Sequence, residues 1–449
     1  MEMQTRLPED FVRLMREHYG DETADALCEA LATTEPEVSV RLNPRKLSSD
    51  ELLAYRPGLE RVPWCPDAFY LKERPAFTFD PLLHAGAYYV QEASSMYVAQ
   101  ILSEELRVKS EELQSPQPLD CNSDSSLFTL HSSLSSLHFP LLALDLCAAP
   151  GGKSTLLQSL LPEGSLLICN EPIAKRSQVL AENMQKWMKG QPATAPQVVV
   201  TQNYPADFGA LTGKVDILLT DVPCSGEGMF RKDEDARKEW SLDNVRMCQQ
   251  RQRNILQDIW HVLKPGGLLI YSTCTFNRYE DEDNVRYFCD EMGGFCITER
   301  HFLPGRDRGE GFYVAAIRKQ QQQVSPDPSQ GGENRRDHSP LLVKGRGRLF
   351  SGLHILYDSA SSEQSPQFPP PLEGQGEPVF IELNYSEALQ YLRREALRVD
   401  APRGPVTLCY RGLILGPGKG VGSRINNLYP EQWRIRTTYT TPFSLLEMV

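Results

Sequence analysis

Two cysteines and one acidic residue stand directly after apolar runs of the sequence. Asp221 and Cys224 follow Asp216–Thr220, and Cys274 follows Gly267–Thr273. A deprotonated thiol is a strong nucleophile, and a carboxylate beside it can hold a base through hydrogen bonds. Addition of a thiolate to carbon 6 of cytosine makes carbon 5 reactive enough to accept a methyl group. The two cysteines together indicate covalent chemistry on a base, whereas a single cysteine is more often a small buried residue.

A glycine-rich turn within residues 144–155 is the candidate nucleoside site. It runs from an apolar strand through Pro-Gly-Gly into a polar helix start, so its backbone can approach a ligand closely. Gly152-Lys153-Ser154 copies the end of a phosphate-binding loop, but that motif needs glycine where Cys147 stands. Glu171 lies 18 residues past the lysine, near the spacing at which an acid binds ribose. A cationic or neutral nucleoside fits this turn best. Two alternatives remain: a nucleoside triphosphatase that uses Asp221, and an ordinary turn that binds no ligand.

Strands and helices alternate through the part of the chain that must position these residues. Parallel strands buried on both faces deliver their carboxyl ends to one edge of a sheet, where ligands bind. Two final strands with a short connection should pair antiparallel at the sheet edge, which favours the methyltransferase form of the doubly wound α/β sheet. The expected strands are Leu141–Leu146, Ser165–Asn170, Gln197–Thr201, Asp216–Thr220, Gly267–Thr273, Phe295–Thr298 and Gly311–Ile317, and the expected helices are Ala174–Lys186, Asp243–Leu263 and Glu280–Glu291.

Two smaller domains are predicted on either side of this central domain, which we place at residues 85–318. Residues 1–84 indicate a small α+β domain. Serine-rich residues 109–138 form a low-complexity insertion, and residues 319–340 form a linker. Residues 341–449 predict a mainly β domain. The individual elements expected here are two helices over 8–32, a strand at Val38–Leu42, a helix over Ala85–Leu102, a strand pair over Gly347–Tyr357, a helix at Ser386–Ala396 and strands at Val406–Leu415 and Trp433–Thr438.

Composition narrows the class of protein. The net charge of −12 argues weakly against a protein that coats nucleic acid, yet from Arg393 to Arg436 eight arginines and one lysine face three acids. That basic excess is either an RNA-binding patch or a solvated face. Eleven cysteines without any C-x-x-C fit neither a disulfide framework nor a zinc site, so no metal is expected. With no run of 18 apolar residues and no secretory leader, we expect a cytoplasmic protein without a membrane segment.

Several motifs in one order resemble those of the Sun-type (Nol/Nop/Sun) RNA cytosine-5 methyltransferases. The similarity extends over nearly the whole chain apart from the insertion and linkers. Its C-terminal part is similar to the bacterial RsmF-like branch, which methylates small-subunit ribosomal RNA. The motifs are Cys147-Ala-Ala-Pro-Gly-Gly-Lys153, Asp221-Val-Pro-Cys-Ser-Gly-Glu-Gly228 with Phe230-Arg-Lys-Asp233, Tyr271-Ser-Thr-Cys-Thr275, Gly412-Leu-Ile-Leu-Gly-Pro-Gly-Lys419 and Asn427-Leu-Tyr-Pro430.

The resemblance implies a role for each matching residue. Cys274 would attack carbon 6 of cytosine, Cys224 would assist release of the methylated RNA, and Asp221 would hold the target base near the cofactor. Lys232 is implied as an active-site or RNA-backbone contact. Glu171 would bind the ribose of S-adenosylmethionine. The methionine part of that cofactor would lie against the remaining motif residues, Cys147, Ala148, Ala149, Pro150, Gly151, Gly152 and Lys153.

The resemblance also implies partners and alternatives. The N-terminal domain and a PUA-like C-terminal domain would bind RNA, either ribosomal RNA or the small ribosomal subunit, and the protein would act as a monomer. The chain departs from the family at Val222, where alanine is usual, and at Gln202-Asn203, where many relatives carry an acid; Asn203 can still hydrogen-bond the adenine edge. A ribosome-assembly factor that binds RNA without catalysis remains a further possibility beside the nucleoside triphosphatase.

Overall fold

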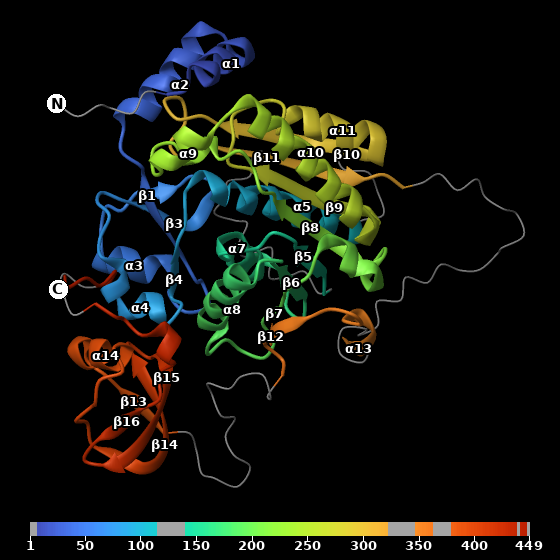
Figure 1. Ribbon diagram of the computed structural model, residues 1–449. Helices are drawn as coiled ribbons and strands as arrows, with labels where there is room; N and C mark the ends of the chain where they lie inside the picture. Colours follow the sequence, from blue (N-terminus) through green and yellow to red (C-terminus); the bar gives the residue numbers. More distant parts are fainter. Residues whose placement is uncertain (1–6, 115–139, 322–345, 362–378, 438–440, 447–449) are drawn as a thin grey trace, which may run out of the picture.

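Three sheets organise the chain in the computed structural model, which describes residues 7–114, 140–321, 346–361, 379–437 and 441–446. The central sheet has eight strands, and each flanking domain contributes a sheet of four. In Figure 1 the C-terminal domain lies below the N-terminal domain, and both lie to one side of the central sheet. Most of the predicted insertion and linker falls outside the described residues. Within the described ranges, no helix combines the length and apolar character that crossing a membrane requires.

The central sheet has the order β10-β11-β9-β8-β5-β6-β7-β12. Its inner strands pair in parallel, whereas β11 pairs antiparallel with both β9 and β10. The predicted parallel sheet with an antiparallel pair at its edge is therefore confirmed. The strands are β5 (Leu142–Asp145), β6 (Leu166–Asn170), β7 (Gln197–Thr201), β8 (Val215–Asp221), β9 (Leu263–Thr273), β10 (Gly294–Phe302), β11 (Phe312–Lys319) and β12 (Ile355–Asp358).

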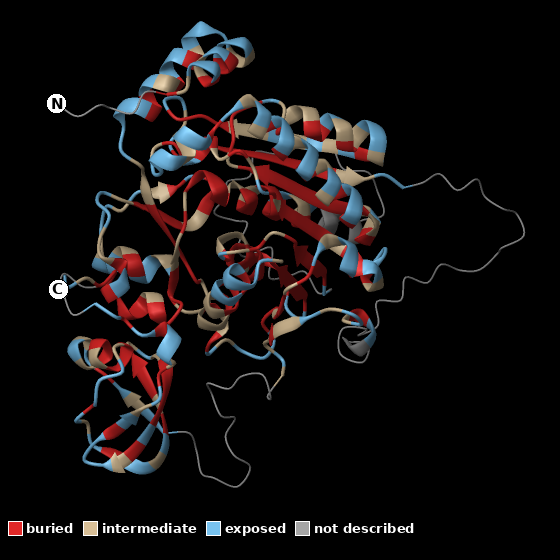
Figure 2. Cartoon of the chain, viewed as in Figure 1, coloured by how far each residue is buried: buried red, intermediate tan, exposed pale blue. Residues whose placement is uncertain are grey.

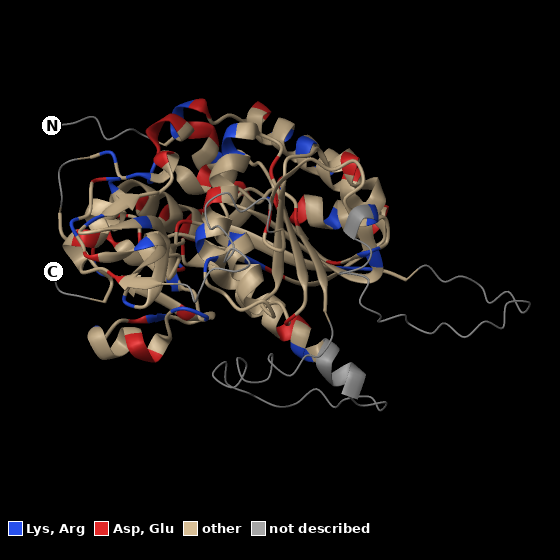
Figure 3. Cartoon of the chain, turned by 90° about the horizontal axis from the view of Figure 1, so that it is seen from below, with Lys and Arg blue, Asp and Glu red and all other residues tan. Residues whose placement is uncertain are grey.

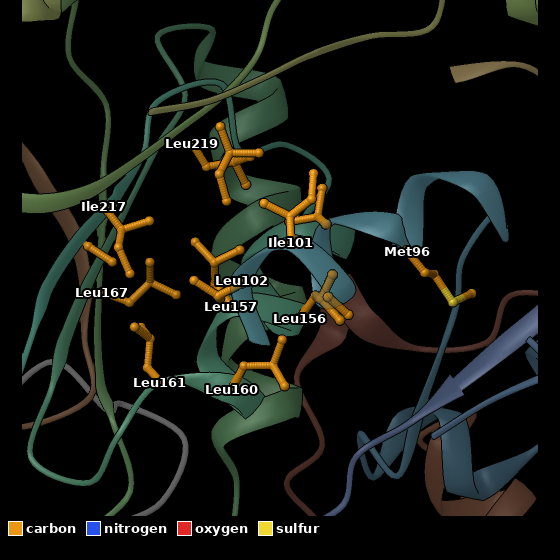
Figure 4. Close-up of a cluster of buried hydrophobic side chains, with 14 of the residues drawn as sticks. Met96, Ile101, Leu102, Leu156, Leu157, Leu160, Leu161, Leu167, Ile217 and Leu219 are labelled. Carbon is orange, nitrogen blue, oxygen red and sulfur yellow. The ribbon is translucent and has the colours of Figure 1, made fainter. Parts of the chain in front are cut away.

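Helices cover both faces of this sheet, and Figure 2 shows its strands as a buried layer between them. On one face, α5, α7 and α8 pack apolar side chains against the sheet, and Figure 4 shows leucines of α7 meeting Leu167, Ile217 and Leu219 of the strands. On the other face, α10 and α11 pack with a short 3-10 helix. Both faces are thus sealed, which leaves the strand ends as the place for chemistry. These helices are α5 (Val98–Gln114), α7 (Gly152–Leu160), α8 (Ala174–Met188), α10 (Leu242–Ile259) and α11 (Glu282–Met292), with 3-10 turns at Pro205–Leu211 and Trp260–Val262.

The N-terminal domain combines two helices with a small sheet. Gly20, with φ of 78°, separates the two predicted helices. The sheet order is β2-β3-β1-β4. The predicted helix over 85–102 was wrong in its first half, because Tyr88–Val90 pairs with β1 and the α-helix begins only at Val98. The elements are α1 (Glu9–Tyr19), α2 (Asp21–Thr33), β1 (Val38–Leu42), α3 (Ser49–Tyr55), β2 (Arg61–Val62), β3 (Cys65–Leu71), α4 (Pro81–His84) and β4 (Tyr88–Val90), with 3-10 turns at Phe77–Phe79 and Ser94–Tyr97.

The C-terminal domain is mainly β, as predicted, but its strands differ from the expected ones. The single strand expected at 406–415 is part of a hairpin of β14 and β15, which turns at Arg411 and Gly412 with φ of 52° and 72°. No strand forms over the described part of 433–438, which follows a 3-10 turn at Glu431–Trp433. The elements are β13 (Phe380–Glu382), α14 (Tyr385–Leu392), β14 (Ala401–Tyr410), β15 (Leu413–Gly422) and β16 (Ile425–Asn427).

Two segments lie in other places than the sequence pattern indicated. Residues 347–357, expected as a strand pair of the C-terminal domain, form the end of helix α13 (Arg346–Leu349) and the strand β12, which pairs antiparallel with β7 of the central sheet. Helix α5 continues through residues 109–114, the start of the predicted insertion. Because edge strands offer unpaired backbone groups, β7 can recruit a strand from far along the chain.

The basic excess over residues 393–436 is partly neutralised within the domain. Arg394 and Arg434 both pair with Glu431, at 2.8 and 3.9 Å. Figure 3 shows positions of lysine and arginine interspersed with acidic positions along the chain. The local charge count is therefore a weaker argument for an RNA surface than the sequence suggested.

Candidate active site

The two cysteines singled out by the sequence meet at the carboxyl ends of neighbouring strands. β8 ends at Asp221 and leads into the loop with Cys224, while β9 ends at Thr273, directly before Cys274. The sulfur atoms of Cys224 and Cys274 lie 3.2 Å apart, and both residues are partly exposed. The contact with Cys274, together with burial, raises the pKa of the Cys224 thiol well above its usual range. Cys224 is thus held as a neutral thiol next to the other sulfur.

An ion pair lies at the end of β8. The ammonium group of Lys153 is 2.9 Å from Oδ2 of Asp221, and the hydroxyl of Ser272 donates to Oδ1 at 2.8 Å. Burial disfavours the charge on Lys153, but Asp221 outweighs it and raises the pKa of the lysine. The ammonium also lies 4.9 Å from the ring centroid of Phe312. Lys153 is therefore a fixed cation beside Asp221.

The glycine-rich turn begins helix α7, as the sequence predicted. Gly151 has φ of 116° at the N-cap, a conformation that side chains with a Cβ rarely adopt. The turn is held at its start by Ala148, whose N–H donates to the carbonyl of Asn170 at 2.8 Å. The Ala149-Pro150 peptide bond is cis. These features fix the backbone from Cys147 to Lys153 at the edge of the sheet.

A buried carboxylate lies beneath this turn. Asp145 is fully buried; its Oδ2 accepts from the hydroxyl of Ser154 at 2.7 Å, while its Oδ1 has no hydrogen-bond partner. The pKa of Asp145 is raised to about 7, and burial is the largest cause. The hydroxyl of Ser154 acts to lower this pKa, whereas the neighbouring Asp221 and Glu171 act to raise it. Three carboxyl groups thus lie near the turn, and two of them are paired with cations, Asp221 with Lys153 and Glu171 with Arg176.

Glu171 and Asn203 stand at the ends of β6 and β7 and are already engaged. Glu171 is 2% exposed; it accepts from the N–H of Ile173 at 3.0 Å and pairs with Arg176 at 3.2 Å. The side-chain oxygen of Asn203 accepts from the N–H of His354, at 3.0 Å, just before β12. A ribose at Glu171 would therefore have to displace Arg176, and an adenine would meet Asn203 through its amide nitrogen.

Lys232 faces an acid other than Asp221. Its ammonium group is 3.9 Å from Glu310, which also pairs with Arg231 at 3.1 Å. Glu310 is 3% exposed and lies in the connection before β11. The structure brings Cys224, Cys274 and Asp221 together, but it gives Lys232 a partner of its own.

Two buried glutamates that the sequence reasoning missed hold the cysteine loops. Glu227 accepts from the N–H groups of Phe276 and Asn277, at 2.6 and 3.1 Å. Glu280 accepts from the N–H of Ser225 at 3.0 Å and from the amide of Gln252 at 2.7 Å. Each glutamate thus ties one cysteine loop to the other. The available signal was that Glu227 lies inside one motif segment and Glu280 lies shortly after another. Sequence alone, however, does not distinguish such buried glutamates from solvent-exposed ones.

A third missed residue, Arg41, connects the N-terminal domain to the glycine-rich turn. Its guanidinium is buried and donates to the carbonyl of Gly152 at 3.2 Å, to the hydroxyl of Thr155 at 2.5 Å and to the side chain of Gln91 at 2.9 Å. It also lies 4.8 Å from the ring of Trp187. The N-terminal domain is thus part of the support of the site.

Replacing Asp145 by asparagine should flatten the pH dependence of stability. The pKa of Asp145 is raised from 3.8 to about 7, so the folded chain holds this proton more tightly than the unfolded chain. Protonated Asp145 contributes at most about 4 kcal/mol to the free energy of unfolding. This contribution is complete below about pH 4 and is lost as the pH rises to about 7. Urea unfolding of both proteins across this range measures the difference. The exposed Asp243→Asn is the control, and parallel pH profiles of wild type and Asp145→Asn would contradict the expectation.

Comparison with known proteins assigns these features to a family. Residues 140–318 match the family model "16S rRNA methyltransferase RsmB/F". Residues 7–93 match "N-terminal domain of 16S rRNA methyltransferase RsmF", and residues 378–435 match "Methyltransferase RsmF PUA domain". The three matches follow one another along the chain without overlap. They also correspond to the three sheets of the structure.

Curated relatives carry one name, "Ribosomal RNA small subunit methyltransferase F". That of Shewanella amazonensis is 31% identical over 63% of this chain and 58% of its own length, and that of Pectobacterium atrosepticum is 31% identical over 69% and 62%. These two alignments cover less than two thirds of the relatives. The protein of Aeromonas hydrophila is 26% identical over 95% of this chain and 97% of its own length.

Solved structures share the fold. A methyltransferase homolog from Pyrococcus horikoshii has a TM-score of 0.54 and 24% identity, over 70% of this chain and 96% of that one. NSun6 from the same organism, solved with SFG, has a TM-score of 0.53 and 17% identity, over 71% of this chain and all of that one. The three consecutive domain matches and the shared name of these relatives make the chain similar to the RsmB/F family of 16S rRNA methyltransferases, with the three domains found in RsmF.

Proposed function

We propose that this protein is an S-adenosylmethionine-dependent RNA cytosine-5 methyltransferase that acts on small-subunit ribosomal RNA through a covalent bond to Cys274. The observation that carries the proposal is the contact of Cys274 with Cys224, at 3.2 Å, beside the ion pair of Lys153 and Asp221. Attack on a cytosine ring requires a nucleophile and groups that stabilise the developing charge, and a second thiol beside the nucleophile can assist its release.

The residues around the glycine-rich turn fit a cationic nucleoside cofactor. Asp145 keeps an unpartnered oxygen beneath the turn, and Asp221 and Glu171 add negative charge around it. S-Adenosylmethionine carries a sulfonium and an ammonium group, which carboxylates stabilise, and when bound it supplies the methyl group. The backbone from Cys147 to Lys153 would hold its methionine part. Glu171 would hold the ribose once Arg176 is displaced, and Asn203 the adenine edge.

The chain's own residues account for attack on the base. Asp221 is 37% exposed on its side chain, so it can accept a hydrogen bond from the exocyclic amine of cytosine. Cys274, as a thiolate, adds to carbon 6, and the ring electrons move to carbon 5 and N3. Lys153 lies next to Asp221 and can stabilise the negative charge that develops. The target must leave its stack or lie in a single strand, because carbon 6 is covered in a duplex.

Release requires the reverse electron movement at carbon 6. After carbon 5 gains the methyl group, its proton leaves to water, the electrons of that bond restore the ring, and the carbon–sulfur bond breaks with its electron pair on Cys274. A thiolate leaves more easily when a neighbouring group donates a hydrogen bond to it. Cys224, with a raised pKa and its sulfur at 3.2 Å, is a neutral thiol in position to donate.

The two alternative functions differ in their predicted ligands. A nucleoside triphosphatase would bind triphosphate near Lys153, but the carboxylates of Asp145, Glu171 and Asp221 oppose that charge. An RNA-binding assembly factor without catalysis would need neither Cys224 nor Cys274. Binding of ATP without S-adenosylmethionine would favour the former, and RNA binding without methyl incorporation the latter.

Mapping 5-methylcytosine across ribosomal RNA tests the proposal directly. We expect at least one position of 16S rRNA to lose the modification in cells without the gene and to regain it with the wild-type gene. In vitro, labelled S-adenosylmethionine offered with naked 16S rRNA or with assembled small subunits identifies the substrate form, and size-exclusion chromatography tests the expected monomer. Such a substrate places the reaction in the cytoplasm. Identical maps with and without the gene would contradict the proposal.

A further inference from the structure

Three potential ligand side chains gather behind the nucleophile loop, outside the site described above. Asp281 and Glu282 stand at the start of α11, and His301 comes from β10. One ligand atom from each, a carboxylate oxygen or an imidazole nitrogen, lies within 4.8 Å of the other two. The Nε2 atom of His301 is 3.1 Å from Glu282 and 3.9 Å from Asp281. A whole helix separates the two parts of this cluster in the sequence, so no motif spacing indicates it.

Each of the three side chains has one atom without a hydrogen-bond partner. The unpartnered atoms are Oδ2 of Asp281, Oε2 of Glu282 and Nε2 of His301, and all three atoms are buried. Asp281 is the decisive residue, because its side chain is fully buried. Leaving a buried carboxylate oxygen unpaired costs free energy unless a cation or a proton satisfies it. The histidine lies within ion-pair distance of both acids, and Glu282 is the nearer of the two.

The surroundings of His301 leave its Nε2 atom free to coordinate. The hydroxyl of Tyr19 lies 3.5 Å from Nδ1 of His301, and it donates its own hydrogen to the carbonyl of Phe276 at 2.5 Å. That hydroxyl can therefore accept a hydrogen from Nδ1, which places the lone pair of the imidazole on Nε2. Histidines that bind metals commonly donate from their other nitrogen in this way. The ring of Tyr313, with its centroid 4.5 Å away, fixes the plane of the imidazole.

We propose that Asp281, Glu282 and His301 bind one divalent transition-metal ion of the Mn²⁺ class. Two carboxylates and one imidazole combine the donors preferred by such ions, whereas Mg²⁺ and Ca²⁺ favour oxygen donors alone. The side chains of Glu282 and His301 are 24% and 11% exposed, so the cluster reaches the protein surface. The site is distinct from the methyl-transfer residues, and its metal binding can be measured without any RNA.

The ion would stabilise the loop that carries Cys274. The hydroxyls of Thr273 and Thr275, the two neighbours of Cys274, both reach Oδ1 of Asp281, at 2.6 and 3.2 Å. A cation on Oδ2 would fix the orientation of the same carboxylate and thereby both threonines. The ion is therefore a positioning element for the nucleophile rather than a participant in the reaction.

Titration of metal-free, full-length protein with Mn²⁺ tests this site. We expect one bound ion per chain, measured by the loss of the EPR signal of free Mn²⁺, and a nitrogen coupling from His301 in the pulsed EPR spectrum. Asp281→Asn and His301→Gln should each weaken binding at least about tenfold. His301→Gln should also remove the nitrogen coupling. Asp283→Asn, an acid of the same helix turn that pairs with Arg286, is the matched control and should bind as the wild type does.

Circular dichroism and thermal unfolding establish that each variant is folded, and His301→Gln carries the test if Asp281→Asn is not. Binding of Mn²⁺ that survives in His301→Gln with its nitrogen coupling intact would overturn the proposal. So would the absence of binding by the wild type at millimolar Mn²⁺, in which case His301 and Glu282 form an ion pair. A metal-dependent rise in melting temperature that occurs in the control but not in His301→Gln supports the proposal.

Discussion

Replacing Cys274 by alanine should abolish methyl transfer and leave binding of S-adenosylmethionine within about twofold of the wild type. The thiol is the group that opens the ring to methylation, so its loss removes the reaction rather than slowing one step. We expect the rate to fall by at least about a thousandfold. Incorporation of labelled methyl groups into 16S rRNA measures the rate, and calorimetric titration measures the cofactor affinity.

The control for this substitution is Cys289→Ala, which removes a partly exposed cysteine on α11. It should retain methyl transfer and cofactor binding. Wild-type turnover by Cys274→Ala would exclude the covalent mechanism. Equal loss of cofactor binding and transfer would instead place Cys274 in the cofactor site, contrary to the proposal.

Replacing Cys224 by alanine should trap the RNA on the enzyme. The carbon–sulfur bond then forms and methylation proceeds, but the departing sulfur of Cys274 lacks the hydrogen bond that Cys224 donates from 3.2 Å. We expect a covalent RNA–protein adduct that persists in denaturing gels and turnover at least about a hundredfold lower than wild type.

A double substitution separates this role from a structural one. Adding Cys274→Ala to Cys224→Ala should remove the adduct completely, since the bond to RNA is made by Cys274. If Cys224→Ala turns over freely without an adduct, Cys224 has no part in release. An adduct that remains in the double variant would identify another nucleophile.

The pairing of residues 355–358 with β7 shows what the sequence pattern could not indicate. A short apolar stretch after a linker is compatible with either neighbouring domain, and hydrogen bonds to the edge of the central sheet decide between them. The hairpin at Arg411 and Gly412 was missed for a related reason. Apolar residues stand on both sides of Arg411-Gly412, and the sequence prediction ran through this pair, which the structure shows as a two-residue turn with positive φ.

The residues around the cysteines divide in the same way. Cys224, Cys274 and Asp221 were predictable, because carboxyl ends of parallel strands meet at one edge whatever the details of packing. Glu227, Glu280 and the Arg41 link were not, since burial of a charged side chain depends on segments distant in the sequence. The role of Lys232 as a site contact stays a prediction, and the fold places its ammonium group 3.9 Å from Glu310.

By itself, the sequence determined the class of sheet, the positions of its inner strands along the chain and the residues at their ends. Apolar runs that alternate with turn residues are local signals of strands and loops. Because the strands are parallel, their carboxyl ends meet at one edge of the sheet. Tertiary structure alone decided that the sulfur atoms of Cys224 and Cys274 touch, that Asp145 lies buried beneath the glycine-rich turn, and that Asp281, Glu282 and His301 converge. The physical reason is that distances between side chains on different elements follow from packing of the whole core, which no local pattern encodes.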